Sequence, residues 1–337
     1  GVNQYPPGLG MPALREAIAA QRLRRYGISY DPDTEVLVTV GATEAIAAAV
    51  FGLVEPGSDV ILVEPFYDSY SPVVAMAGCR RVTVPLVPDG RGFALDIDAL
   101  RRAAAGPNAR ALIVNSPHNP TGMVLTDAEL SAVAQIAVEH DVLVITDEVY
   151  EALVFDGEHR PLAGYPGMAQ RTITISSAAK MFNCTGWKIG WACGPTDLIA
   201  GVRAAKQYLS YVGGAPFQPA VALALDTEDA WVAGLRESLR RKRDTPSSAL
   251  TDIGFEVHNS SGTYFVCADP RPLGHDDGTS FCLELPHRVG VAAIPLSAFC
   301  DPGGRHYSRW NHLVRFAFCK RADTLAEAIH RLQALRR

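Results

Sequence analysis

The sequence predicts an α/β fold, with a mostly parallel, doubly wound sheet in a large domain and a smaller α+β domain after it. Between residues 35 and 211, short runs rich in Val and Ile alternate with longer segments of helical periodicity, which is the order of βαβ units. The runs are apolar on both faces, as parallel strands covered by helices are. Because this alternation stops near residue 215, we place a large domain at 1–215 and a small C-terminal domain at 216–337.

The strands expected in the large domain are its β-branched, apolar runs. In chain order they are EVLVTV (35–40), DVILVEP (59–65), RRVTVPLV (80–87), ARALIVNSP (109–117), DVLVITDE (141–148), RTITISS (171–177) and WKIGWACG (187–194). Helices are expected between several of them, over 43–54, 95–105 and 127–140. In such sheets ligands bind beyond the carboxyl ends of the strands, so the functional residues are expected there.

The small domain is expected to hold fewer and shorter strands. A helical stretch over 220–244 is followed by GFEVHN (254–259), TYFVCAD (263–269), GVAAIP (290–295) and HLVRFAF (312–318), and a last helix begins near Thr324. This order of elements is typical of an α+β unit that packs on a larger α/β domain.

Composition restricts the class of partner. Hydrophobic residues make up 48% of the chain and charged residues 20%, values typical of a globular protein. A net charge of -5 and a pI near 6.0 give no broad basic surface for nucleic acid or for a lipid membrane. The longest apolar run, 45–54, is shorter than the roughly 20 residues of a membrane span. The expected partners are therefore small molecules.

The seven cysteines are scattered and show no CxxC spacing. This pattern favours reduced thiols in a cytoplasmic protein over a disulfide framework or a zinc site. The chain starts at Gly1 without Met, a basic region or an apolar signal region, and we expect a further segment before it.

Polar and aromatic residues follow five of the predicted strands. Each group alone has a plainer explanation: an N-cap for Thr43, a structural turn for NSPHNPTG, a core position for an aromatic, a solvated surface for a lone lysine. Asp147, at the end of VLVITDE, has two equally good interpretations: a strand-end residue with ordinary hydrogen bonds, or a buried counter-charge for a cation. The residues concerned are Gly41, Ala42, Thr43, Phe66, Tyr67, Asn119, Asp147, Tyr150, Ser177 and Lys180.

Several common catalytic motifs do not fit. GLGMPA at 8–13 matches G-x-G-x-x-A in outline, but it follows Tyr5-Pro6-Pro7 where a dinucleotide fingerprint needs a strand. The chain has no HExxH, no G-x-S-x-G and no P-loop. We therefore expect no metal, and neither a serine hydrolase nor a nucleotide-binding enzyme.

One ligand would contact residues at all five strand ends. It is a phosphorylated, cationic aromatic ring that forms an imine with a lysine, and pyridoxal 5'-phosphate has this chemistry. Lys180 supplies the amine and afterwards moves a proton as a general acid and base. Asp147 pairs with the ring N–H and keeps the ring protonated. The other expected roles are the ring oxygen for Tyr150 and Asn119, the ring face for Phe66, and the phosphate for Ser177, Lys188 and the backbone at Gly41, Ala42 and Thr43.

Five motifs, NQYPPGLGMPALREAIA, NSPHNPTG, TDEVYE, SSAAKMFNCTGWKIGW and HLVRFAFCK, resemble in their order the class I and II aminotransferases of fold type I, in the kynurenine and aspartate aminotransferase group. The resemblance covers nearly the whole chain and implies the same roles for Lys180, Asp147, Asn119 and Tyr150. It further implies that Arg315 binds the substrate α-carboxylate, with Asn119 beside the substrate. Tyr5 matches a residue that reaches the neighbouring subunit's phosphate site, which implies a homodimer with shared sites.

The resemblance extends to the substrate class. EPFYDSYSPVVAMAG and QYLSYVGGAPFQPAVALALDTEDAWVA resemble members that act on an N-acylated diamino dicarboxylate in lysine and cell-wall precursor synthesis, with a 2-oxo acid as the second substrate. A kynurenine or glutamine transaminase and a cysteine-conjugate β-lyase remain open, because these enzymes share the site up to the carbanion. A pyridoxal-phosphate-binding regulatory module is the alternative outside enzymes.

Overall fold

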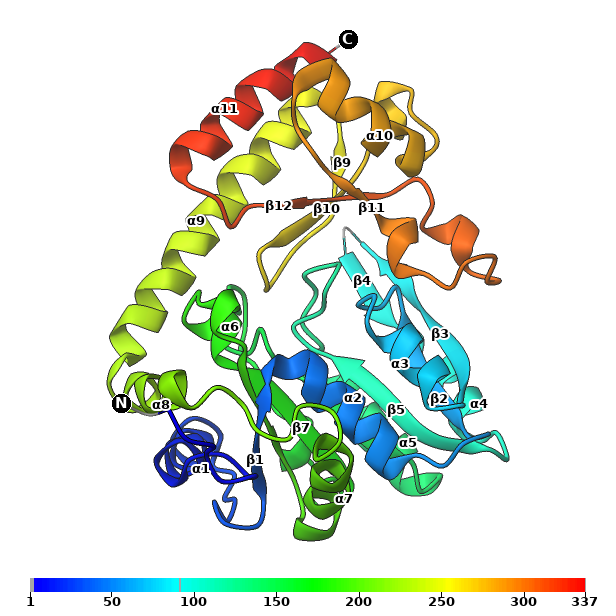
Figure 1. The fold of residues 1–337 in the computed structure, drawn as a ribbon. Helices are drawn as coiled ribbons and strands as arrows, with labels where there is room; N and C mark the ends of the chain where they lie inside the picture. The colour runs from blue at the N-terminus through cyan, green and yellow to red at the C-terminus, as the bar shows by residue number, and fades with distance from the viewer. Residues whose placement is uncertain (1–2, 91, 337) are drawn as a thin grey trace.

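The fold was taken from a computed structural model, which describes residues 3–90 and 92–336; the predicted large domain is thus described from Asn3 onward. Its central feature is a sheet of eight strands among these residues (Figure 1). In spatial order they are β1 (Val36–Val40), β8 (Ile189–Cys193), β7 (Thr172–Ser177), β6 (Leu143–Asp147), β5 (Ala109–Asn115), β2 (Asp59–Glu64), β3 (Arg80–Asp89) and β4 (Gly92–Leu95).

The sheet is mostly parallel, as the sequence predicts. Strands β7, β6, β5, β2 and β3 pair in parallel, whereas β8 runs antiparallel to both β7 and β1, and β4 is antiparallel to β3. Side chains alternate between two hydrophobic cores: Leu112 and Val114 of β5 pack in one, Ala111 and Ile113 in the other. Both faces are thus covered, which explains why these strands are apolar throughout.

Helices cover the two faces of the large sheet. Figure 1 shows α2 and α7 on one face and α5 on the other. The helices of this part of the chain are α1 (Pro12–Tyr26), α2 (Gly41–Leu53), α3 (Tyr70–Met76), α4 (Ile97–Ala104), α5 (Asp127–Glu139), α6 (Ala178–Met181) and α7 (Thr196–Lys206). The predicted helix at 95–105 starts only at Ile97, because 92–95 forms β4.

A second sheet of four short antiparallel strands lies in the C-terminal part. Its order is β11 (Ile294–Pro295), β12 (Val314–Ala317), β10 (Phe265–Asp269) and β9 (Glu256–Val257). Helices α9 (Asp229–Ile253), α10 (Gly278–Val289) and α11 (Ala322–Leu332) belong to the same part, whereas α8 (Gln218–Thr227) packs against α1 of the large domain. The boundary between 215 and 216 stays a prediction; the two sheets lie on opposite sides of it in the sequence.

The helical stretch predicted at 220–244 differs in the structure. It divides into α8 and α9 at Glu228, and α9 continues past Asp244 through Pro246 to Ile253. Proline in a helix removes one hydrogen bond, but Leu239, Leu250 and Ile253 of α9 are buried in the core of the small sheet. Burial of this apolar face outweighs the local cost. No helix in the described part of the chain has the length and hydropathy of a membrane span.

Candidate active site

A cavity of about 430 Å³ opens where the strands of the large sheet end, and the small domain forms part of its wall. This volume suits a small-molecule ligand. Ten of the twelve predicted site residues line it: Gly41, Ala42, Thr43, Asn119, Asp147, Tyr150, Ser177, Lys180, Lys188 and Arg315. Segments far apart in the sequence thus meet at one place.

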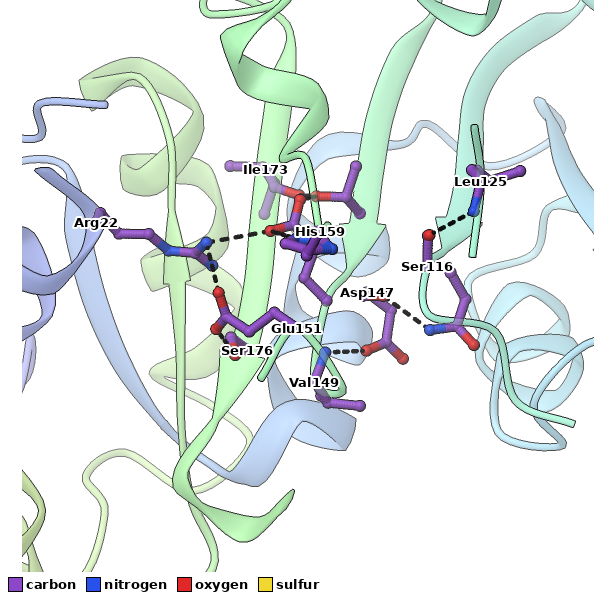
Figure 2. Close-up of polar contacts among 12 residues, drawn as sticks. Arg22, Ser116, Leu125, Asp147, Val149, Glu151, His159, Ile173 and Ser176 are labelled. Atoms are coloured by element: carbon purple, nitrogen blue, oxygen red, sulfur yellow. Dashed lines mark hydrogen bonds and ion pairs between the residues drawn. The ribbon is translucent and has the colours of Figure 1, made fainter. Parts of the chain in front are cut away.

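Asp147, the last residue of β6, is a buried carboxylate with several donors. Tyr70 Oη donates to its Oδ2 at 2.6 Å and the Val149 N–H donates to its Oδ1 at 3.2 Å, the second of which is drawn in Figure 2. Burial raises the pKa of Asp147, although these donors and the nearby Lys180 favour the ionised form. The sequence left two interpretations of Asp147 open, and its position favours the buried counter-charge. The residue is 4% exposed and lines the cavity.

Lys180 lies on α6, a single turn that directly follows β7. Its Nζ is 5.7 Å from the ring centroid of Tyr150 and 5.5 Å from that of Tyr264. The two tyrosine rings meet edge to face at 5.3 Å. Burial raises the pKa of Tyr150 well above its ordinary value, and the neighbouring Tyr264 adds to this. The amine therefore lies beside an aromatic wall in which the Tyr150 hydroxyl stays protonated.

Arg315 and Asn119 join the two parts of the chain across the cavity. Arg315 Nη1 donates to Asn119 Oδ1 at 2.6 Å, and the Asn119 N–H donates to Asn115 Oδ1 at 2.7 Å. The guanidinium carbon lies over the rings of Phe265 and Phe299, 3.9 and 4.5 Å from their centroids. Burial lowers the pKa of Arg315 from its ordinary value. A cationic fork fixed in this way suits a carboxylate.

The N-terminus of α2 forms another wall of the cavity. The helix begins at Gly41, so Thr43 lies inside it and is not its N-cap. The N-cap residue, Val40, makes no side-chain capping bond, and its own N–H donates to Glu44 Oε2 at 2.6 Å. The N–H groups of the first turn have no partner within the helix, and such a helix end favours an anion. Gly41 has φ of 75°, and a Cβ there would lie 3.2 Å from Lys188 Nζ. Glycine therefore leaves room for a lysine above the first turn.

Phe66 requires a correction. It does not line the cavity but is buried in a hydrophobic core, and its N–H donates to the Phe299 carbonyl at 2.7 Å. The aromatic at the cavity wall is the next residue, Tyr67. The sequence motif places an aromatic pair here, but only the path of the backbone after β2 decides which ring faces the cavity.

Tyr5 also lies away from the cavity of its own chain. It is 79% exposed and contacts Tyr211 edge to face at 5.5 Å. Its predicted role toward a neighbouring subunit therefore stays a prediction.

Two tyrosines of the cavity wall had no predicted role in the sequence, and a third tyrosine lies behind the wall. Tyr67 and Tyr264 line the cavity, and Tyr70 bonds Asp147 from the start of α3. In the sequence they are ordinary aromatics next to predicted strands. No sequence pattern pointed to Tyr70, because it opens α3 and its partner Asp147 lies 77 positions away.

These donors fit pyridoxal 5'-phosphate. The cavity provides an amine, a buried carboxylate for a cationic ring nitrogen, a hydroxyl and an amide for a ring oxygen, and a helix N-terminus with a lysine for a phosphate. Fold and site together define an enzyme that uses this cofactor. The chain belongs to the family described as aminotransferase class I and II, which matches residues 1–332, and the cofactor of this family is pyridoxal 5'-phosphate.

Individual relatives are similar over nearly the whole chain. A probable N-succinyldiaminopimelate aminotransferase DapC of Mycobacterium tuberculosis is 75% identical over 99% of this chain and 85% of its own. A solved structure of N-succinyldiaminopimelate aminotransferase from the same organism gives a TM-score of 0.97 at 76% identity, covering 99% of this chain and 86% of that one. The methionine aminotransferase of Escherichia coli is 38% identical over 99% of this chain and 85% of its own.

Proposed function

We propose that this aminotransferase transfers the amino group of N-succinyl-L,L-diaminopimelate to 2-oxoglutarate, in the synthesis of diaminopimelate and lysine. The observation that carries this proposal is the 75% identity over 99% of the chain to the mycobacterial relative that bears this name. Amino and 2-oxo acids are the substrates of the family, and both carry the α-carboxylate that a fixed guanidinium suits.

In this proposal Lys180 is the covalent and proton-transferring residue. Pyridoxal 5'-phosphate, when bound, supplies an aldehyde for the amine and a cationic ring that accepts electrons from the substrate Cα. Lys180 would hold the cofactor through its amine and, when that amine is free, would take the proton from the substrate Cα as a general base. Its place beside Tyr150 and Tyr264 in the cavity supports this role.

Other residues bind and orient. Burial of Asp147 disfavours its ionised form. A cationic ring nitrogen beside it would offset this cost, because a nearby positive charge favours the ionised carboxylate. Arg315, held by Asn119, binds the substrate α-carboxylate. We assign the ring oxygen to Tyr150 and Asn119, the ring face to Tyr67, and the phosphate to Ser177, Lys188 and the N-terminus of α2 from Gly41 to Thr43.

We further propose a homodimer whose two sites are shared. Several large aromatic side chains are exposed and in contact: Trp187 stacks on Phe217 at 4.9 Å, and Tyr5 packs on Tyr211 while Tyr208 is 90% exposed. Exposed aromatics in such number are typical of an interface between protein chains. Among the described residues the cavity wall has only three cations, Lys180, Lys188 and Arg315, so a second chain is a ready source of a ligand for the distal carboxylates.

We also retain the cytoplasm as the expected compartment. All seven cysteines lie in the described ranges and none forms a disulfide. Reduced thiols are the rule in that compartment.

The substrate is tested by steady-state kinetics. We expect kcat/KM for N-succinyl-L,L-diaminopimelate to exceed that for kynurenine, methionine and cystathionine by at least about 100-fold, a difference of roughly 3 kcal/mol in transition-state binding. A preference for any of the other three amino donors overturns the substrate assignment. Release of pyruvate and ammonia from cystathionine, with no glutamate formed from 2-oxoglutarate, overturns the transfer reaction.

The covalent residue is tested by reduction with borohydride. In the wild type, borohydride is expected to attach the cofactor permanently to the chain, with loss of the visible absorbance band, whereas Lys180→Ala is expected to remain unlabelled. Lys188→Ala is the matched control, because this second cavity lysine is assigned to the phosphate. Labelled Lys180→Ala protein contradicts the assignment.

A further inference from the structure

A buried group of ionisable side chains lies on the far side of the cofactor-binding strands, and we call it the Arg22 cluster: Arg22, Glu148, Glu151 and His159. Arg22 Nη1 donates to Glu148 Oε2 at 3.1 Å and to Glu151 Oε2 at 3.0 Å, and His159 Nε2 lies 3.0 Å from Glu148 Oε2. The Arg22 and Glu side chains are at most 3% exposed. Figure 2 shows Arg22 pointing from α1 toward the carboxylate of Glu151.

The cluster is an ion-pair network and not a metal centre. One ligand atom from each of Glu148, Glu151 and His159 lies within 4.8 Å of the others, a spacing that a metal could use. However, a single guanidinium nitrogen already bonds both carboxylates. Burial lowers the pKa of Arg22, but Glu151 and Glu148 outweigh it and raise the pKa overall, so the cation stays charged.

Each partner of Arg22 is next in sequence to a residue of the cavity. Glu148 follows Asp147, and Glu151 follows Tyr150. Glu151 also accepts a hydrogen bond from Ser176, the residue before Ser177. Side chains of a strand alternate between its faces, so Asp147 and Ser177 face the cavity while Thr146, Glu148 and Ser176 face the cluster; Thr146 Oγ1 donates to Glu148 Oε1 at 3.1 Å.

The turn that carries Tyr150 is therefore held at both ends by one cation. The Glu148 carbonyl accepts from the Glu151 N–H at 2.8 Å, which closes the turn, and the side chains of both residues converge on Arg22. Without this cation two carboxylates would face each other in a buried place, a costly arrangement that the turn would relieve by moving. A shift of about 1 Å at a reacting group lowers rates by up to about 100-fold.

We propose that Arg22 is a positioning residue: from helix α1 it holds Glu148 and Glu151, and through them sets Asp147, Tyr150 and Ser177 for the cofactor. This inference rests on the proposed function of those three residues. Arg22 touches neither cofactor nor substrate, and it acts across the thickness of the sheet.

The experiment compares Arg22→Met, Arg22→Lys and wild type. Arg22→Met keeps most of the side-chain volume and removes the charge. We expect the Kd of the apo-protein for pyridoxal 5'-phosphate to rise at least about tenfold and kcat to fall at least about tenfold. The pH midpoint of the bound cofactor's visible absorbance should shift, and amide hydrogen exchange over 147–151 should accelerate in the apo-protein. Arg22→Lys, which keeps the charge, is expected to restore most of each change.

The matched control is Arg25→Met on the same helix. Arg25 Nη2 pairs with Asp229 Oδ1 at 2.6 Å, and its side chain is 22% exposed. Arg25→Met should leave the cofactor Kd and kcat within about twofold of wild type, and the pH midpoint of the absorbance unchanged. If Arg22→Met lowers only the melting temperature and leaves these three quantities unchanged, Arg22 is merely structural and the proposal is wrong.

A gentler variant decides the matter if Arg22→Met does not fold. Ser176→Ala removes one hydrogen bond to Glu151 without unpairing a charge, and it should raise the cofactor Kd at least about threefold, the effect of about 0.7 kcal/mol. An unchanged Kd and absorbance midpoint in Ser176→Ala then overturn the proposal. Failure of the proposed function gives a different result, since it would change the amino-donor preference of the wild type and leave its cofactor band in place.

Discussion

The hydroxyl of Tyr70 donates a hydrogen bond of 2.6 Å to the carboxylate of Asp147, from the first turn of α3 to the end of β6. Both groups are buried. A donor at this place favours the ionised carboxylate, which is the form that a cationic ring nitrogen requires.

Removing this donor should therefore weaken the site. In Tyr70→Phe we expect the pKa of Asp147 to rise further and the cofactor Kd to increase about tenfold, since a hydrogen bond to a charged group contributes about 1.5–3 kcal/mol. Titration of the apo-protein with pyridoxal 5'-phosphate measures this. Tyr165→Phe is the matched control, because Tyr165 Oη donates to Asp127 at 2.7 Å at the surface. Equal effects in the two variants would argue against a special role for Tyr70.

Burial of Asp147 also predicts how the stability of the apo-protein depends on pH. The pKa of Asp147 in the folded chain is raised above its ordinary value of 3.8, so the folded state holds this proton more tightly than the unfolded state. Its contribution to stability is therefore present at low pH. It is lost as the pH rises from about 3.8 through the raised pKa.

The substitution Asp147→Asn removes this loss of stability at rising pH, because an amide does not ionise. At neutral pH we expect its apo-protein to melt at least roughly 2 °C above the wild-type apo-protein, the shift that about 1 kcal/mol produces in a large domain. The same variant should bind the cofactor much more weakly, because the ring nitrogen loses its counter-charge. Differential scanning calorimetry across the acidic range checks the first effect, and a lower melting temperature for the variant contradicts it.

The Arg315 fork predicts a separation of substrate binding from cofactor binding. In Arg315→Lys we expect kcat/KM to fall about 10- to 100-fold, because a single ammonium cannot reproduce a bidentate contact and its bond to Asn119 together. The cofactor Kd should change less than about twofold. Arg321→Lys, an exposed arginine paired with Asp323, serves as the control. Equal losses of cofactor and substrate affinity would place Arg315 elsewhere in the mechanism.

Close packing behind the phosphate site predicts a steric effect at Gly190. A Cβ on this residue would lie 2.5 Å from the carbonyl carbon of Gly41 and 2.7 Å from the Ala42 nitrogen. Gly190→Ala should therefore displace the N-terminus of α2, lower the free energy of unfolding by about 1–3 kcal/mol and weaken phosphate binding. Gly186→Ala, where a Cβ meets nothing within 4 Å, is the control. Inorganic phosphate competition against the cofactor measures the local effect separately from stability.

Sharing of sites between two chains predicts complementation. Tyr5→Ala and Lys180→Ala should each have low activity, but refolding them together should restore about a quarter of wild-type activity, because half of the dimers are mixed and each has one intact site. A mixture no more active than its components contradicts a role for Tyr5 in the partner's site. Sedimentation of the wild type checks the dimer itself.

The sequence alone predicts the alternation of strands and helices, because the periodicity of apolar residues reports which faces of each element are buried. It also predicts that the ends of β1, β2, β5, β6 and β7 carry the site, since the strand order of such sheets brings these ends together. Lys180, Asp147 and Asn119 follow from this rule. Their residue types narrow the chemistry to one cofactor.

What the tertiary structure alone decides is which side chains meet over long sequence separations. Phe66 and Tyr67 are adjacent and both aromatic, and only the backbone after β2 turns one into the core and the other into the cavity. Tyr70 and Arg22 carry no sequence signal for contacts with Asp147, Glu148 and Glu151 that lie 77 to 129 positions away. Local periodicity fixes the direction of a side chain relative to its own element, whereas the partner it finds depends on how the elements pack.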